Sequence, residues 1–153
     1  MIKKIRAEEK LSVSEIETII NGCVEFDTVA FEGVFRFEDT SKHFFMLGKN
    51  AVESLIMVTK PNLRLDFSKA KIFYDLKTLT CKTVFLTLYQ TARNVRIIGL
   101  DLQIRYIGEA TTHTLYGLYN FGHSLLVDRC NIEIYAEKQI NTAALANYGG
   151  IDT

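Results

Sequence analysis

Hydrophobic and polar residues alternate along most of the chain after Cys23, and this period-two pattern is typical of half-buried β-strands. Three alternating segments share one frame, because they begin at Ala70, Leu100 and Cys130, at a spacing of 30 residues. In each segment the first, third and fifth residues are mainly apolar, and the residues between them are mostly polar. A strand that recurs at a fixed period predicts a chain that winds once per repeat and stacks on itself.

A second repeat supports the same winding. The segment 116–122 (YGLYNFG) matches the segment 143–149 (AALANYG) at an offset of 27 residues. Asn120 and Asn147 occupy equivalent places in the two segments, just after a strand. They predict either a structural ladder, in which side-chain amides hydrogen-bond between coils at a tight turn, or two independent turn residues.

The 30-residue period also predicts which side chains meet. Strands in neighbouring coils lie about 4.8 Å apart, so each inward residue faces its counterpart in the next coil. Two outward pairs, Lys71 with Asp101 and Asp75 with Arg105, would then carry opposite charges, which favours cross-strand neighbours. The predicted inward columns are Ala70–Leu100–Cys130, Ile72–Leu102–Ile132 and Tyr74–Ile104–Ile134.

One segment near the start predicts a helix. Ser12 and Glu15 have the spacing of a capping box, and Gly22 supplies the stop, so the helix spans about residues 12–21. Val13, Ile16, Ile19 and Ile20 form an apolar stripe on its surface. A helix of about three turns is marginal alone, so this stripe must be buried against the coils. Residues 24–153 hold no second amphipathic helix, which argues against a doubly wound sheet.

Three segments after the helix resemble a known fold family. Residues 31–37 (FEGVFRF), 61–67 (PNLRLDF) and 94–100 (NVRIIGL) are similar to the first coils of right-handed parallel β-helix proteins of the pectin-lyase-like superfamily. The resemblance covers residues 12–153. With the repeats it predicts an all-β chain, a right-handed parallel β-helix (solenoid) of about four coils with an N-terminal capping α-helix. One domain, 1–153, would hold the cap and the coils over residues 24–153.

The amino-acid composition limits the classes of partner that the chain is expected to bind. Eighteen basic residues balance 18 acidic ones, and no dense basic cluster occurs beyond Lys3, Lys4 and Arg6, so nucleic-acid binding is not expected. The apolar runs are too short for a bilayer, and no secretory signal is present, so neither membrane insertion nor a compartment is indicated. Three cysteines without C-x-x-C spacing indicate neither a metal site nor a disulfide framework, and no cofactor motif is found.

The resemblance implies an association with carbohydrate, as in the opening coils of a polysaccharide lyase-like or phage tail-spike-like protein. The paired-aspartate and Gly-His-Gly motifs of a polygalacturonase-like site are absent, since the segment Gly122-His123-Ser124 departs at its third residue. No acid/base pair with supporting spacing can be named. We therefore expect a non-catalytic or catalytically incomplete module.

One outward face carries the candidate ligand-binding residues. The alternation places Asp101, Arg105, Asn131 and Glu133 on this face, with Tyr135 beside Arg105. A carboxylate, an arginine and a tyrosine on a flat sheet can hold a sugar through hydrogen bonds and ring stacking. The alternative is a solvated face with ion pairs between coils.

The last residues, 149–153, predict a final coil that stops just after it starts. An uncapped β-helix presents an apolar end with unpaired edge groups. Either the chain is the N-terminal part of a longer protein, or another molecule covers this end. If another molecule covers the end, we expect the chain to be a stand-alone intracellular protein. It would bind a macromolecular partner, or a second copy, through a sheet face or the open C-terminal end.

Overall fold

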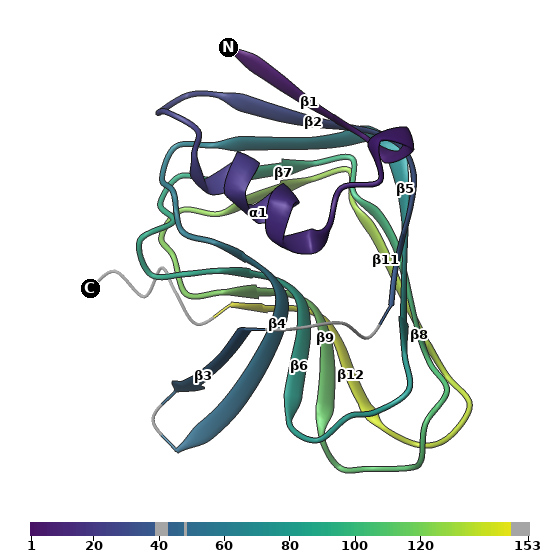
Figure 1. Cartoon of the computed structure of the whole chain (residues 1–153). Coiled ribbons are helices and arrows are strands. Elements are labelled where there is room, and N and C mark those ends of the chain that lie inside the picture. Colours follow the sequence, from purple (N-terminus) through teal and green to yellow (C-terminus); the bar gives the residue numbers. More distant parts are fainter. Residues whose placement is uncertain (39–42, 48, 148–153) are drawn as a thin grey trace.

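The computed structural model describes residues 1–38, 43–47 and 49–147. The chain forms a β-solenoid of about five turns, in agreement with the predicted parallel β-helix. Figure 1 shows the turns stacked on one another, with strands of successive turns side by side on each wall.

Twelve strands, one α-helix and one short 3₁₀-helix make up the described part of the chain. The helices are η1 (Ala7–Glu9) and α1 (Val13–Asn21). The strands are β1 (Ile2–Arg6), β2 (Thr28–Phe37), β3 (His43–Leu47), β4 (Asn50–Val58), β5 (Arg64–Leu76), β6 (Lys82–Leu88), β7 (Arg96–Ile98), β8 (Asp101–Tyr106), β9 (Thr114–Asn120), β10 (Leu126–Asp128), β11 (Asn131–Ala136) and β12 (Asn141–Asn147).

The strands form two sheets. The first has the order β1-β2-β5-β7-β10, with β8 between β5 and β11, and the second has the order β12-β9-β6-β4-β3. The first sheet bends at Gly33 and Gly99, where φ is +108° and +66°, so β7 and β8 continue one another around the bend. A positive φ favours glycine, which explains why glycine occupies both positions.

The register confirms both sequence repeats. Leu102 lies opposite Ile72 on one side and Ile132 on the other, as the 30-residue period predicts. Leu118 lies opposite Leu145, as the 27-residue offset predicts. The pairs are parallel, so successive coils lie directly over one another.

The predicted asparagine ladder is present. The Asn120 Nδ2 atom donates a hydrogen bond to the Asn147 Oδ1 atom over 2.9 Å. The Asn120 Oδ1 atom accepts from the Gly122 N–H group, also over 2.9 Å. Asn120 is buried, so these two hydrogen bonds satisfy its amide nitrogen and oxygen atoms where water cannot reach them.

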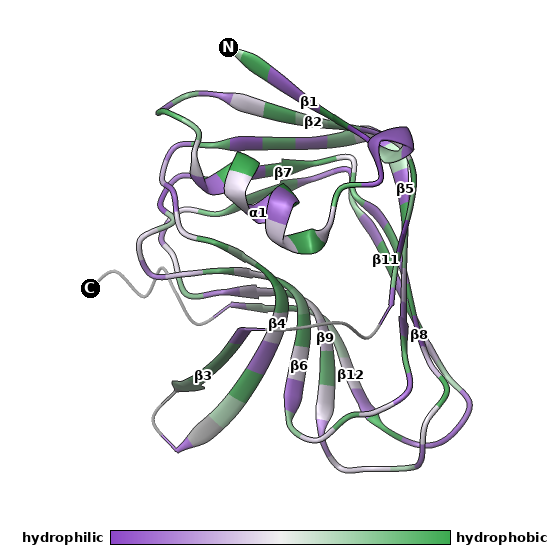
Figure 2. Ribbon diagram, in the orientation of Figure 1, coloured by the Kyte–Doolittle hydropathy of each residue, from purple (hydrophilic) through white to green (hydrophobic). Residues whose placement is uncertain are grey.

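The core lies between the two sheets. Ile72, Tyr74, Leu102 and Ile104 are almost completely buried, and the corresponding residues of the last coil, such as Ile132, are half-buried. Cys130, predicted to be buried, is also half-buried and packs against this core. Figure 2 shows hydrophobic and hydrophilic positions alternating along strands such as β8, as inward and outward side chains require.

Helix α1 covers the N-terminal end of the core. The capping box is formed as predicted, with the Ser12 Oγ and Glu15 Oε1 atoms each accepting a backbone N–H from the other residue. The apolar stripe buries Ile16 and Ile20. The Asn21 side chain then bonds the backbone on both sides of residue 58, which fixes the helix on β4.

Three details differ from the sequence prediction. The solenoid has about five turns instead of four, because β1 adds a strand that pairs with β2. The Glu-Gly pair at residues 32 and 33 predicts a turn between two strands, but in the structure it forms a bend within the single strand β2. Strand β3 pairs antiparallel with β4, an arrangement that alternation alone does not reveal. The predicted end of the last coil, 149–153, lies outside the described residues.

Candidate functional site

The structure brings the five predicted ligand-binding residues onto one face. Asp101 and Arg105 lie on β8, and Asn131, Glu133 and Tyr135 lie on the neighbouring β11. Asp101 is in register with Asn131, and Arg105 is in register with Tyr135. We call this surface the β8–β11 face. Tyr135 is its main apolar feature, with 54% of its surface exposed.

Polar groups on the β8–β11 face make contacts with one another and with β5. The Arg105 Nη2 atom lies 3.2 Å from the Asp75 Oδ2 atom, so this predicted ion pair between coils is formed. The Asn131 Nδ2 atom donates to the Glu133 Oε1 atom over 3.2 Å. Such contacts between exposed groups contribute little stability, so a ligand could replace them at small cost.

The second predicted ion pair does not form among the described residues. The Lys71 Nζ atom lies 5.4 Å from the centre of the Phe73 ring, a cation–π contact within its own strand. Asp101 is half-buried beside Asn131. The long Lys71 side chain can reach either Asp101 or the Phe73 ring, and the register of the strands does not determine which of the two it contacts.

Three tyrosines of β8 and β9 are buried. Tyr106, Tyr116 and Tyr119 are each less than one-tenth exposed. Tyr119 packs against the half-buried Phe121, with ring centres 4.6 Å apart, in a small cluster separate from the main core. These three rings therefore belong to the interior and are not available to a ligand.

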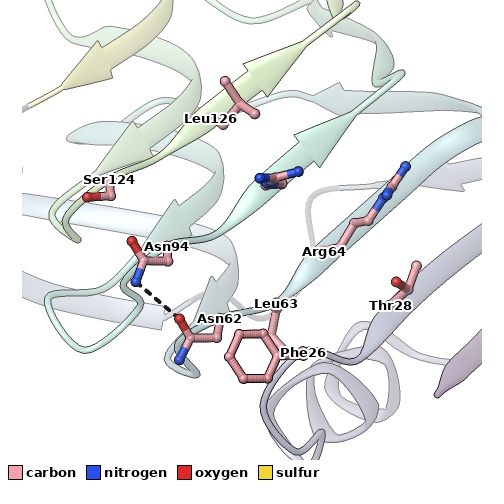
Figure 3. Close-up of a pocket in the computed structure, with 9 residues that line it drawn as sticks. Phe26, Thr28, Asn62, Leu63, Arg64, Asn94, Ser124 and Leu126 are labelled. Atoms are coloured by element: carbon pink, nitrogen blue, oxygen red, sulfur yellow. Dashed lines mark hydrogen bonds between the residues drawn. The ribbon is translucent and has the colours of Figure 1, made fainter.

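A second candidate surface lies on the other side of the bend, where each coil turns into the first sheet. Four successive coils place a residue with a left-handed backbone at the same point, with φ between 54° and 67°: Phe26, Asn62, Asn94 and Ser124. The Asn94 Nδ2 atom donates to the Asn62 Oδ1 atom over 3.1 Å, which forms a second amide ladder (Figure 3). Asparagine tolerates this conformation better than most residues with a Cβ atom.

Two residues further along each coil, the side chains point outward in one column. Thr28, Arg64, Arg96 and Leu126 are in register across β2, β5, β7 and β10. Together with the left-handed turn residues they line a groove of about 570 Å³, which we call the arginine groove. Figure 3 shows the Phe26 ring beside Leu63 at one end of the groove and Leu126 at the other.

The two arginines of this groove have no carboxylate within ion-pair distance in the described part of the chain. Two acidic residues nearby, Asp66 and Asp128, have other hydrogen-bond or ion-pair partners, and the Asp66 carboxylate also interacts with the charge of Arg64 at longer range. The Ser68 hydroxyl donates to Asp66 over 2.6 Å and lowers the pKa of that carboxyl below its ordinary value. Asp128 pairs with Arg129 at 3.2 Å. Arg64 and Arg96 therefore present their charges to solvent.

A smaller hollow of about 240 Å³ adjoins the arginine groove and shares Asn94 and Ser124 with it. Arg93 and His123 complete its lining. The residues that line the two hollows include three arginines and no acidic residue. The chain as a whole has no net charge, so this region concentrates positive charge locally.

A repeated sequence pattern marks the arginine groove, although the alternation of hydrophobic and polar residues does not reveal it. The triplets Asn62-Leu63-Arg64 and Asn94-Val95-Arg96 share an Asn-x-Arg pattern at an offset of 32 residues. The pattern places a left-handed turn, an inward residue and an outward arginine in the same order in two neighbouring coils.

Within the described residues, no three His, Cys, Asp or Glu side chains gather in the way a metal site needs. The helices of the same residues are too short and too polar for one of them to cross a membrane. Comparison with protein families, with curated proteins and with solved structures finds no match to this chain.

Proposed function

We propose that the chain is a non-catalytic or catalytically incomplete carbohydrate-associated β-helix module that contacts a saccharide on the β8–β11 face. The observation that carries the proposal is the exposed ring of Tyr135, in register with Arg105 on a flat parallel sheet. Aromatic rings offer an apolar surface to the C–H groups of a sugar, and neighbouring polar groups fix its orientation.

The polar side chains around Tyr135 suit this role. Asp101, Asn131 and Glu133 offer planar amide and carboxylate groups on the same two strands. A saccharide has many hydroxyl groups, each able to donate and accept, so a mixed set of donors and acceptors matches it better than a set of one sign. The parallel sheet holds these groups in a fixed order at a spacing of about 4.8 Å between strands.

The proposal predicts that a glycan array probed with the purified chain will show binding that depends on Tyr135 and Arg105. The double variant Tyr135→Ala, Arg105→Ala should weaken the affinity for the strongest ligand by at least about tenfold, since it removes both the ring and the charged donor. Isothermal titration with that ligand gives the number.

A matched control removes one exposed arginine and one exposed ring elsewhere. Arg36 lies on β2 over the Phe73 ring, and Phe44 lies on β3 with 63% of its surface exposed. The variant Arg36→Ala, Phe44→Ala should bind as the unchanged chain does. An array on which the intact chain binds no glycan would count against the proposal, as would equal affinities for the two double variants.

A second candidate is the docking of a protein partner, or a second copy, at the end of the solenoid formed by the last coil. The partial exposure of the inward residues Ile132 and Ile134 favours it, because their counterparts in earlier coils are buried. Sedimentation equilibrium of the purified chain with and without Ile134→Lys separates the second-copy form of this candidate from the glycan proposal, since only the former requires a complex that the variant disrupts.

A further inference from the structure

We propose that the arginine groove is a binding site for a doubly charged oxyanion, in particular a phosphate monoester, and that it is separate from the β8–β11 face. Charged residues lie opposite one another on neighbouring strands at four places in the described registers. Among the described strands, three such pairs are of opposite sign, Arg6–Glu32, Glu32–Lys69 and Asp75–Arg105. Arg64–Arg96 is of like sign.

A like-charge pair directly across two strands is destabilising, and no carboxylate of the described chain forms an ion pair with either arginine, although the Asp66 carboxylate interacts with the charge of Arg64 at longer range. An uncharged polar residue at either position would remove the repulsion between the two arginines, because both positions are exposed and accept many side chains. A local arrangement that opposes stability without a compensating contact points to a functional requirement. Two exposed arginines in register on adjacent strands suit an anion that carries two charges.

The chemistry of the site favours phosphate. A phosphate monoester carries a charge of about −1.5 to −2 near neutral pH and offers three acceptor oxygens. Guanidinium groups donate two parallel hydrogen bonds to such oxygens, so arginines on adjacent strands can share one phosphate. The Asn94 amide lies in the same groove and adds a neutral donor.

The walls of the groove indicate that the phosphate belongs to a larger molecule. Phe26 has 78% of its surface exposed and Leu126 has 49%, and both line the groove. Exposed apolar side chains beside a charged centre offer contacts to the carbon skeleton of an ester, which inorganic phosphate lacks. The groove volume of about 570 Å³ leaves room for a ring beside the anion.

The test is a titration of the ¹⁵N-labelled chain, followed by backbone amide shifts. The probes are phenyl phosphate, phenyl sulfate, which carries one charge, and inorganic phosphate. Phenyl phosphate should shift the amides of residues 62–64, 94–96 and 124–126, and should bind more tightly than phenyl sulfate. Comparison of phenyl phosphate with inorganic phosphate distinguishes the two sources of the anion. A higher affinity for phenyl phosphate indicates an ester, and equal affinities indicate free phosphate. Both results support a dianion site.

Two variants separate binding from structure. Arg96→Gln should weaken phenyl phosphate binding by about tenfold or more, and Arg36→Gln, at an exposed arginine outside the groove, should leave it unchanged. Without ligand, Arg96→Gln should also raise the melting temperature, because it removes the like-charge repulsion. A merely structural arginine would instead lower it.

The proposal is overturned by any of three results. The first is a set of shifts that lies outside the groove or is absent at millimolar phenyl phosphate. The second is equal binding of phenyl sulfate and phenyl phosphate. The third is an Arg96→Gln variant that melts at a lower temperature and binds phenyl phosphate unchanged. None of these results bears on glycan binding at the β8–β11 face, so the two proposals can fail independently.

Discussion

Replacement of Leu102 by alanine is expected to lower the free energy of unfolding by about 2–5 kcal/mol, which is the range for truncation of a buried leucine. Leu102 is completely buried and lies between Ile72 and Ile132 in the middle of the stack. A cavity at this point removes contacts to the coil on each side. Because each strand is held by ladder hydrogen bonds to both neighbours, the backbone cannot collapse far into the space.

The matched control is Leu145→Ala, the same chemical change on the outermost described coil. Leu145 has 44% of its surface exposed, so its truncation should cost about 1 kcal/mol or less. Urea unfolding followed by circular dichroism measures both values. If the two variants lose the same stability, Leu102 is not at the centre of a packed stack.

Replacement of Gly122 by alanine is expected to cost at least about 3 kcal/mol, near the upper end for single substitutions. A Cβ atom at residue 122 would clash with the Ala92 carbonyl oxygen and would lie 3.2 Å from the Tyr89 carbonyl oxygen. Both neighbours are backbone atoms of the preceding coil, so no rotamer change relieves the clash. The Gly122 N–H group is also held by the Asn120 ladder.

Gly22→Ala serves as the control for Gly122→Ala. Residue 22 ends α1 at the surface, and its Cβ atom would lie 2.8 Å from the Thr18 carbonyl oxygen. A small shift of an exposed helix end relieves that contact, so the loss should be clearly smaller. Thermal unfolding of the two variants measures the order, and a smaller loss at Gly122 would show that the coils are not in close backbone contact there.

The stacking of the coils could be predicted from the sequence because the same residue kinds return to the same wall. Leu102 must be apolar since Ile72 and Ile132 are above and below it, and this requirement is visible as a 30-residue period. The antiparallel strand β3 could not be predicted, because alternation is the same in parallel and antiparallel strands. Strand β1 is short and partly charged, and only its pairing with β2 makes it part of the solenoid.

The candidate sites were predictable to different degrees. The shared face of Asp101, Arg105 and Tyr135 follows from register alone. The contact of Lys71 with Phe73 depends on the side-chain rotamer, which sequence does not give. The arginine groove needs a left-handed turn in four coils, and two of those turns are at Phe26 and Ser124, which lack the glycine or asparagine that usually marks one.

The central feature of the fold is the direct superposition of the three coils that hold Ile72, Leu102 and Ile132. Methyl-labelled protein offers the most direct measurement, through nuclear Overhauser contacts between these side chains. The structure predicts contacts from the Leu102 methyl groups to both isoleucines, which are its partners in the parallel register. The absence of both contacts, in spectra where other core methyl pairs are resolved, would contradict the stacked solenoid.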